Sequence, residues 1–408
     1  MPTATSDSAH SSDHLQRRLG PFDATMIVMG GIVGSGIFVT PATVARSVGT
    51  TGLILGAWLI GGVAALAGAF VYAELAARRP HVGGQYAYLR DAYHPAVAFL
   101  YGWALLLVIQ TGGMAASAVT FARYALELWP NAPHILANAQ DNERALGTLA
   151  LALLTAVNCV GVRAGGGLQS LLMLLKIGAI LALVVGGLWR AGGPSVDGGA
   201  AAVAPDTAGP FALVGAMGAA LIPVLFSYGG WQTAGFVAGE IKEPARNLPR
   251  AMLLGVAGVI ALYVLVAFVC VRVLGPAGLG RASAPALDVM RRAFGARGAQ
   301  FLAAAVSLST LGFLSQSILT APRVYYAMAN DGLFFAAVGK LDRRTHVPVA
   351  AIVLQGALAG LIALWGHYDG ILSYVVSIDF IFFGLTASGM FSRTLAELQV
   401  DPAQLELT

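Results

Sequence analysis

Two glycine-rich strings are the parts of this sequence best suited to bind a small charged molecule. Residues 30–38 read GGIVGSGIF and residues 223–231 read PVLFSYGGW, each in the middle of a long apolar run. Glycine in such a run predicts a break in a helix, which frees backbone N–H and C=O groups that lipid cannot satisfy. Freed N–H groups at a helix N-terminus suit a carboxylate, and freed carbonyls at a C-terminus suit an ammonium group. Together the two strings predict a site for a small zwitterion.

The glycines also allow a simpler interpretation. Gly30 and Gly34 have the spacing by which membrane helices pack closely, so the first string could serve helix packing alone. Four glycines and a serine between Gly30 and Gly36 are more than packing requires, which favours a binding site. A dinucleotide-binding loop is excluded because Gly34-Ser35-Gly36 lacks the third glycine of that motif and no strand–helix–strand unit surrounds it.

Two ionisable side chains also fall inside apolar runs. Lys176 lies within LLMLLKIG, and Asp379 stands between Ile378 and Phe380. A charge at membrane depth is costly, so such residues are functional candidates by default. Lys176 could hold unwound backbone together, carry a proton, or extend its ammonium toward the membrane surface. Asp379 could line a binding cavity or pair with a polar group for structural reasons.

The overall composition indicates a membrane protein. Of the 408 residues, 57% are hydrophobic and 11% are charged, whereas soluble proteins average about 25% charged residues. A soluble chain of this size could not cover its surface with so few charges. The net charge of +4 is dispersed, so we expect no nucleic-acid partner, and both cysteines lie in apolar runs, which argues against a disulfide. Membrane lipid is the expected surroundings.

The apolar runs predict an all-α fold. A membrane-spanning helix needs about 20 apolar residues, and we find about ten such runs. They cover approximately residues 22–47, 52–77, 95–128, 146–164, 168–191, 211–238, 248–274, 299–329, 348–366 and 369–392. Residues 284–294 are predicted to form a short amphipathic helix in an external loop. The two glycine-rich strings fall in the first and sixth runs, so each opens a set of five helices, as in transporters built from inverted repeats.

Basic residues in short loops predict the orientation of the chain. They gather on the side that holds the N-terminus, which is therefore predicted to be cytoplasmic. These residues are Arg17, Arg18, Arg78, Arg79, Arg90, Arg163, Lys242, Arg246, Arg250, Lys340, Arg343 and Arg344. Residues 1–20 are polar and lack the pattern of a signal peptide, so we interpret them as a disordered cytoplasmic tail.

Five strings, in order along the chain, resemble the amino acid–polyamine–organocation (APC) superfamily, and most closely its L-type amino acid transporter branch. The resemblance runs from about residue 18 to residue 391. The strings are residues 34–38 (GSGIF), 83–93 (GGQYAYLRDAY), 226–231 (FSYGGW), 240–251 (EIKEPARNLPRA) and 323–332 (RVYYAMANDG).

The resemblance implies a leucine-transporter-like 5+5 inverted-repeat bundle with helices 1 and 6 unwound in mid-membrane. It implies halves at 21–191 and 192–392, alternating access, and location in a cell (inner) membrane. The backbone at Ile32, Val33, Gly34, Ser35 and Gly36 would bind a substrate carboxylate, with Ser35 assisting. Carbonyls near Phe226, Ser227, Tyr228 and Gly229 would take the amino group, and Phe226 would also gate the site.

Other site residues follow from the same resemblance. Lys176 matches a lysine near the sodium site of sodium-coupled relatives, which implies sodium independence and a role in coupling. Asp379 would face the distal part of the pocket. Side-chain readers of the substrate are expected among Trp231, Phe226, Gln110, Ser315 and Gln316.

The end of the chain departs from the family pattern. Members of the family usually have twelve spans, whereas residues 393–408 form an atypical polar tail and spans 11–12 are absent. A truncated or frame-shifted chain is one interpretation.

The resulting prediction is a sodium-independent secondary transporter of neutral amino acids, by exchange or proton-linked uptake. A permease for cationic amino acids or polyamines, a non-transporting amino acid sensor and a truncated inactive product remain alternatives. We expect no enzymatic activity, no cofactor and no metal, and we leave formation of a homo-oligomer open. A channel is disfavoured because the sequence shows no repeated filter.

Overall fold

The computed structural model describes residues 19–78, 83–128, 138–160, 166–190, 209–342, 347–365 and 368–398. The described part is helical apart from turns and one isolated bridge between Leu19 and Ile241. The cytoplasmic tail predicted over residues 1–20 lies almost entirely outside the described residues, as does most of the polar tail, although the last helix continues to Leu398.

The described residues of the first half of the chain form nine helical segments. In order they are α1 (Pro21–Ile32), α2 (Gly36–Val48), α3 (Thr51–Arg78), α4 (Gln85–Ala92), α5 (Pro95–Ala104), the π-helical η1 (Leu105–Ile109), α6 (Gln110–Glu127), α7 (Ala139–Cys159) and α8 (Gly166–Arg190). The second half contributes α9 (Pro210–Tyr228), the 3₁₀-helical η2 (Trp231–Glu240), α10 (Pro244–Arg281), α11 (Pro285–Thr320), α12 (Pro322–Asn330), α13 (Val349–Trp365) and α14 (Tyr368–Leu398).

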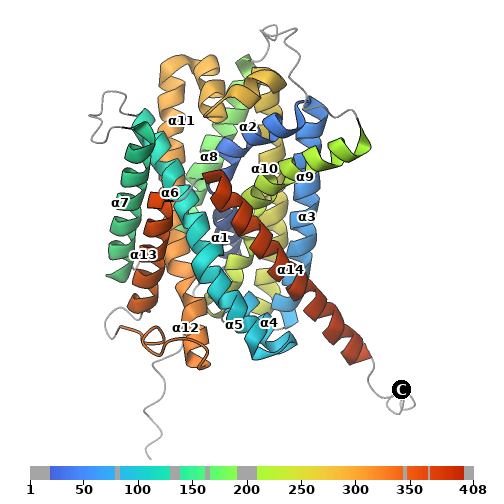
Figure 1. The fold of residues 1–408 in the computed structure, drawn as a ribbon, viewed down its shortest axis with the longest axis vertical. Coiled ribbons are helices and arrows are strands. Elements are labelled where there is room, and N and C mark those ends of the chain that lie inside the picture. Colours follow the sequence, from blue (N-terminus) through green and yellow to red (C-terminus); the bar gives the residue numbers. More distant parts are fainter. Residues whose placement is uncertain are drawn as a thin grey trace, which may run out of the picture.

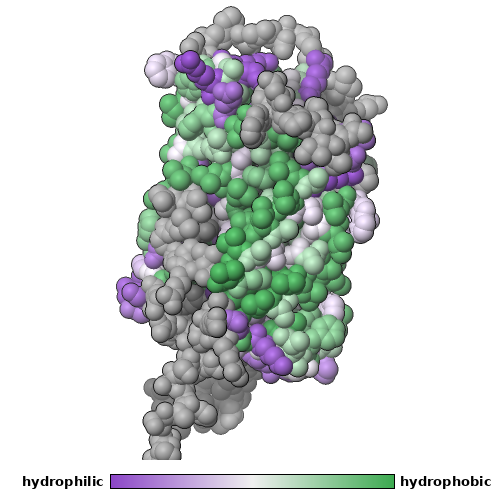
Figure 2. All heavy atoms as spheres, turned by 90° about the vertical axis from the view of Figure 1, so that its left-hand side faces the viewer, coloured by the Kyte–Doolittle hydropathy of each residue, from purple (hydrophilic) through white to green (hydrophobic). Residues whose placement is uncertain are grey.

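Length and hydropathy identify the membrane-spanning parts. Among the described residues six helical stretches are long and apolar enough to cross a membrane, and the α1–α2 pair makes a seventh. The shorter apolar helices α8 and α13, together with α7, would complete the predicted ten spans. On the face shown in Figure 2, hydrophobic residues cover the middle of the molecule and hydrophilic residues gather toward its two ends. This pattern is the one expected of a multi-pass membrane protein.

Helix ends follow the local sequence. Proline opens α1, α5, α9, α10, α11 and α12, where its missing N–H is not needed. Gly275 kinks α10 near its C-terminus, and Gly295 kinks α11 near its N-terminus. Their φ angles are 70° and 66°. The external loop expected around residues 284–294 is therefore mostly helical, and the amphipathic helix predicted there is the N-terminal part of α11.

The helices form one bundle around the two broken spans. α1 and α3 pack against α10, while α2 packs against α9. On the other side α6 packs against α7, α11 and α13, and α14 crosses the front of the bundle at a slant (Figure 1). The short helices α4 and α12 lie at the same end of the molecule (Figure 1). The interior left between these groups holds the site.

Candidate functional site

The first helix break opens the wall of a central cavity. α1 ends at Ile32, α2 begins at Gly36, and the pair bends by 41°. The Gly34 N–H donates to the Ile32 carbonyl at 2.8 Å, so the chain leaves helical hydrogen bonding there. The first N–H groups of a helix have no partner within that helix. Because Gly34, Ser35 and Gly36 line the cavity, the N-terminus of α2 is part of its wall.

The second break interrupts the sixth apolar run. α9 ends at Tyr228, Gly229 is extended, and Gly230 adopts a φ of 108° that L-residues rarely take. The Gly230 N–H donates to Oε1 of Gln232 at 3.0 Å, and the Thr233 hydroxyl donates to the Gly230 carbonyl at 2.7 Å. These two side chains replace hydrogen bonds that a continuous helix would have made.

The two breaks touch each other backbone to backbone. A Cβ atom on Gly31 would lie 2.8 Å from the Gly230 carbonyl oxygen, and one on Gly230 would collide with the Gly31 carbonyl. A Cβ atom on Gly36 would lie 2.9 Å from the Cα atom of Ser227. The glycines are therefore required for close packing as well as for chain breaking, and both interpretations of the first string hold at once.

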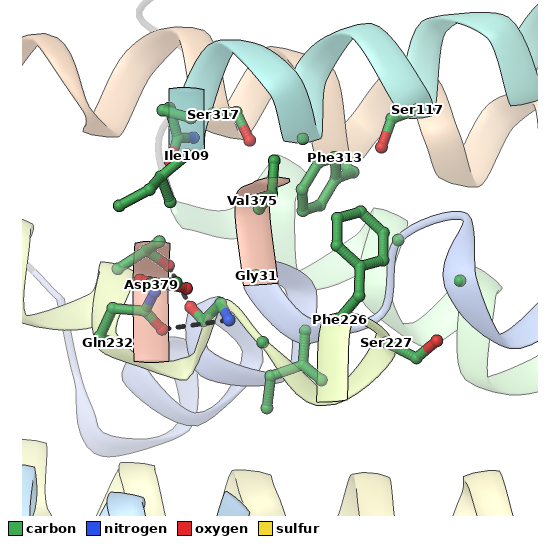
Figure 3. A pocket seen from close by; sticks show the side chains of 18 of the residues that line it. Gly31, Ile109, Ser117, Phe226, Ser227, Gln232, Phe313, Ser317, Val375 and Asp379 are labelled. Carbon is green, nitrogen blue, oxygen red and sulfur yellow. Dashed lines mark hydrogen bonds between the residues drawn. The ribbon is translucent and has the colours of Figure 1, made fainter. Parts of the chain in front are cut away.

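The cavity encloses about 80 Å³ between α2, α6, α9, α11 and α14. Its volume accommodates several water molecules, at about 10–15 Å³ each on this measure. Figure 3 shows Ser117 and Ser227 at one end and Gln232 and Asp379 at the other. η1 ends at Ile109, next to Gln110, and both residues line the cavity. Such π-helical turns are frequent at functional sites.

Eight of the residues predicted from the sequence line this cavity. They are Ile32, Gly34, Ser35, Gly36, Phe226, Ser227, Gly229 and Asp379. Gln110 and Gln316, expected as side-chain readers, line it too. Ser315, the remaining suggested reader on α11, is not among the lining residues.

Three predicted residues, Val33, Tyr228 and Trp231, are not among the lining residues. The Val33 carbonyl accepts a hydrogen bond from Lys176, and its side chain is fully buried. The Tyr228 hydroxyl donates to the Trp58 carbonyl at 3.2 Å. The Trp231 ring stacks on Phe383 with ring centroids 5.0 Å apart. These three side chains shape the surroundings of the cavity without forming its wall.

Lys176 and Tyr263 complete the hydrogen bonding at the end of α1. The Lys176 ammonium, 3% exposed, donates to the Val33 carbonyl at 3.1 Å. The Tyr263 hydroxyl donates to the Ile32 carbonyl at 3.1 Å. Unpaired carbonyls at membrane depth are costly, so these side chains from α8 and α10 stabilise the break. Holding unwound backbone together was one of three roles considered for Lys176 from the sequence, and its coupling role stays a prediction. Tyr263 was missed because a tyrosine in an apolar run resembles a core residue.

Asp379 is the only charged side chain among the described residues that line the cavity. It is 8% exposed, and its Oδ1 atom is buried without a hydrogen-bond partner among the described residues. A carboxylate in this setting can accept hydrogen bonds or a proton from whatever enters the cavity.

Several lining residues were not predicted from the sequence. They come from α6, η2, α11 and α14, and include Ser117, Gln232, Thr233, Phe313, Ser317, Thr320, Val375 and Val376. Gln316 also secures α1, because its Nε2 atom donates to the Ile27 carbonyl at 3.1 Å. The sequence around the unpredicted lining residues is ordinary for membrane helices, and only the packing of distant segments brings these residues together.

A multi-pass helical membrane protein whose two discontinuous helices meet at a polar cavity has the architecture of a secondary transporter. The sequence confirms this class, because residues 19–394 match the amino acid permease family. The chain belongs to that family, whose members are transporters rather than enzymes.

Curated relatives cover almost the whole chain. Large neutral amino acids transporter small subunit 2 of Mus musculus is 29% identical over 398 residues, which are 95% of this chain and 72% of that protein. The b(0,+)-type amino acid transporter 1 of Homo sapiens is 28% identical over 92% of this chain and 76% of its own length. The serine/threonine exchanger SteT of Bacillus subtilis (strain 168) is 28% identical over 94% of this chain and 84% of its own length.

Proposed function

We propose that this protein transports neutral amino acids by alternating access, without sodium, through exchange or proton-linked uptake. The observation that carries the proposal is the cavity between the N-terminus of α2 and the C-terminus of α9. N–H groups and the positive end of a helix dipole at Gly34–Gly36 suit a carboxylate. Carbonyls at the end of α9, near Phe226 and Ser227, suit an ammonium group. An amino acid backbone carries both groups at the required short spacing.

The contact of Lys176 supports sodium independence. Its ammonium group lies on the Val33 carbonyl, at the break where a bound cation would otherwise satisfy freed carbonyls. A positive charge already at this position disfavours a sodium ion beside it. Exchange is supported by the relative from Bacillus subtilis (strain 168), whose name describes an exchanger.

The architecture and location belong to the same proposal. We infer an inverted repeat, with halves at 21–191 and 192–392, because α1–α2 and α9–η2 are the first spans of the two halves and both are broken. We place the N-terminus in the cytoplasm and the protein in a cell (inner) membrane. Arg90 on α4 and Lys340, ten residues after α12, support this orientation, since α4 and α12 lie at the same end of the molecule. Formation of a homo-oligomer stays a prediction.

Asp379 favours a second candidate function. A carboxylate in the cavity wall suits a cationic side chain, as in a permease for cationic amino acids or polyamines. The rest of the cavity offers only neutral groups, among them Phe226, Phe313 and Val375, which suits a neutral side chain better.

Uptake of radiolabelled amino acids into proteoliposomes, without sodium, tests the proposal. We expect vesicles preloaded with unlabelled amino acid to take up label faster than empty ones. Uptake that requires sodium would contradict sodium independence. No uptake by monodisperse protein would contradict transport and leave a sensor or an inactive product, which a binding measurement would separate.

A further inference from the structure

A column of buried polar side chains leads away from Asp379 and toward α4. Its members are Asp379 and Thr386 on α14, Tyr72 on α3, Tyr101 on α5, and Gln85 and Tyr88 on α4. All six are buried, with exposures between 0% and 8%. Asp379 and Thr386 are seven positions apart, so they lie two turns apart on the same face of α14.

The members are adjacent in space. The rings of Tyr72 and Tyr101 pack edge to face on Phe383 and Phe382, with centroids 5.9 Å and 5.2 Å apart, and both phenylalanines lie about one turn of α14 beyond Asp379. The rings of Tyr72 and Tyr88 meet edge to face with centroids 6.1 Å apart. The Gln85 side-chain amide donates to the Thr386 hydroxyl at 3.2 Å, which joins the column to the start of α4.

Most of these groups have unused hydrogen-bonding capacity. The hydroxyls of Tyr72, Tyr88 and Tyr101, Oε1 of Gln85 and Oδ1 of Asp379 have no hydrogen-bond partner among the described residues. Buried polar groups rarely remain unpaired, and bound water usually completes them. Five such atoms in one cluster indicate a path for internal water and not a set of isolated defects.

Among the described residues, no cationic side chain forms an ion pair with the Asp379 carboxylate. The segments packed against α14 are α3, α4, α6, α9 and η1, and aromatic rings of α5 and η2 also contact it. In the described residues, the titratable groups on these segments near α14 include the tyrosines of the column, Tyr228, whose hydroxyl donates to the Trp58 carbonyl, and Tyr93, whose hydroxyl donates to the Leu385 carbonyl. The charged groups of α3, α4 and α6 are paired elsewhere: Glu74 with Arg78, Arg123 with Glu143, Glu127 with Arg291, and Arg90 with Asp91 and Asp331. A lone carboxylate away from water is costly, whereas a carboxyl group needs only hydrogen bonds.

We propose that Asp379 binds the proton that accompanies each amino acid, and that the Tyr72–Tyr88–Tyr101–Gln85 column with internal water conducts this proton to the α4 side of the protein. The proton enters with the amino acid through the cavity, whose wall Asp379 forms together with Gln232 and Val375 (Figure 3). It leaves through the column, so one proton and one zwitterion move in the same direction. This inference rests on the proposed transport function and selects proton-linked uptake from its two coupling modes.

The test compares uptake with and without a proton gradient in proteoliposomes, using an equimolar radiolabelled mixture of the proteinogenic L-amino acids. For the wild type, an inside-alkaline gradient of one pH unit raises the accumulation limit by about tenfold at one proton per substrate. In Asp379→Asn this ratio is expected to fall to about one, whatever its residual rate. A wild-type ratio of one, or an unchanged ratio in Asp379→Asn, overturns the proposal. Counterflow of the wild type, measured without a gradient, tests the transport function separately.

If Asp379→Asn fails to fold, variants at two tyrosines still test the column. Tyr72→Phe and Tyr101→Phe each remove one hydroxyl and are expected to slow gradient-driven uptake several-fold more than counterflow. Tyr374→Phe, on α14 but 70% exposed, is the matched control and should change neither rate. Equal slowing of both rates in Tyr72→Phe and Tyr101→Phe overturns the column. A shift in the preference for arginine over leucine in Asp379→Asn, with an unchanged gradient ratio, would assign Asp379 to substrate recognition instead.

Discussion

The ammonium group of Lys176 lies 3.1 Å from the carbonyl oxygen of Val33, which is 143 positions earlier in the chain. This hydrogen bond joins α8 to the unwound segment after α1. The carbonyl at the break is thereby satisfied within the protein, and the N–H groups at the start of α2 stay available on the cavity side. The relationship links the stability of the break to the geometry of the proposed binding site.

Replacing Lys176 with alanine should impair transport more than folding. The substitution leaves the Val33 carbonyl buried without its partner, at a cost of about 1–3 kcal/mol that distorts the break. We expect uptake per monodisperse protein molecule to fall at least about tenfold, the equivalent of about 1.4 kcal/mol. Lys340→Ala, an exposed lysine, is the matched control. A wild-type uptake rate in Lys176→Ala would refute this role.

Replacing Gly36 with leucine should abolish amino acid binding. A Cβ atom at this position lies 2.9 Å from both Cα and Cβ of Ser227, so the larger side chain pushes α2 and α9 apart. The contacting atoms include the Ser227 Cα atom, which belongs to the backbone and cannot move aside without shifting α9, as well as its Cβ and hydroxyl oxygen. Gly178→Leu on α8 faces open space and should bind normally. Equilibrium binding of radiolabelled amino acid distinguishes the two, and retained affinity in Gly36→Leu would exclude the first break from the site.

The positions of the helices were predictable because each membrane-spanning helix needs its own run of about 20 apolar residues. The two breaks were predictable for the same local reason, since clustered glycines weaken a helix whatever packs around it. Within each string, some of the predicted residues line the cavity and others do not. Phe226, Ser227 and Gly229 face the cavity, whereas Tyr228 and Trp231 turn away, because successive residues of a helix point in directions about 100° apart.

The remaining cavity residues could not be predicted from local sequence. Ser117 and Phe313 reach the site only because α6 and α11 pack beside the breaks, which is long-range information. The role of Tyr263 has the same origin, since its partner Ile32 is 231 positions away. Asp379 was the exception, because an ionisable residue in an apolar run is a functional candidate from the sequence alone.

The ion pair that joins α4 to the end of α12 should contribute modestly to stability. Arg90 contacts Asp331 at 2.5 Å, and the Tyr86 hydroxyl donates to the same carboxylate at 2.8 Å. Both charged side chains are about one-third exposed, so solvent screening limits the effect of Asp331→Asn to about 1 kcal/mol. Thermal unfolding in detergent should show a decrease of a few degrees that shrinks at high salt. Glu243→Gln, which breaks a more exposed ion pair, is the control and should change little.

The same bond predicts a pH dependence. Burial, followed by the hydrogen bond to Asp331, raises the pKa of Tyr86 above its ordinary value of 10.0. A raised pKa in the folded protein stabilises it below that ordinary value, and the contribution disappears as the pH rises through the folded value. The difference in unfolding temperature between the wild type and Tyr86→Phe should therefore be constant at neutral pH and decline only in strongly alkaline buffer. A decline near neutral pH would contradict this assignment.

The binding mode at the two breaks is tested most directly by competition with modified amino acids. Radiolabelled amino acid bound to purified protein is displaced by its unlabelled parent, by the parent's methyl ester or by its N-acetyl derivative. The ester lacks the carboxylate expected at Gly34–Gly36, and the acetyl derivative lacks the ammonium expected at the end of α9. Each modification should weaken competition by roughly 100-fold, the loss expected for charge-assisted hydrogen bonds. Competition by either derivative as strong as that of the parent would contradict zwitterion binding between α2 and α9.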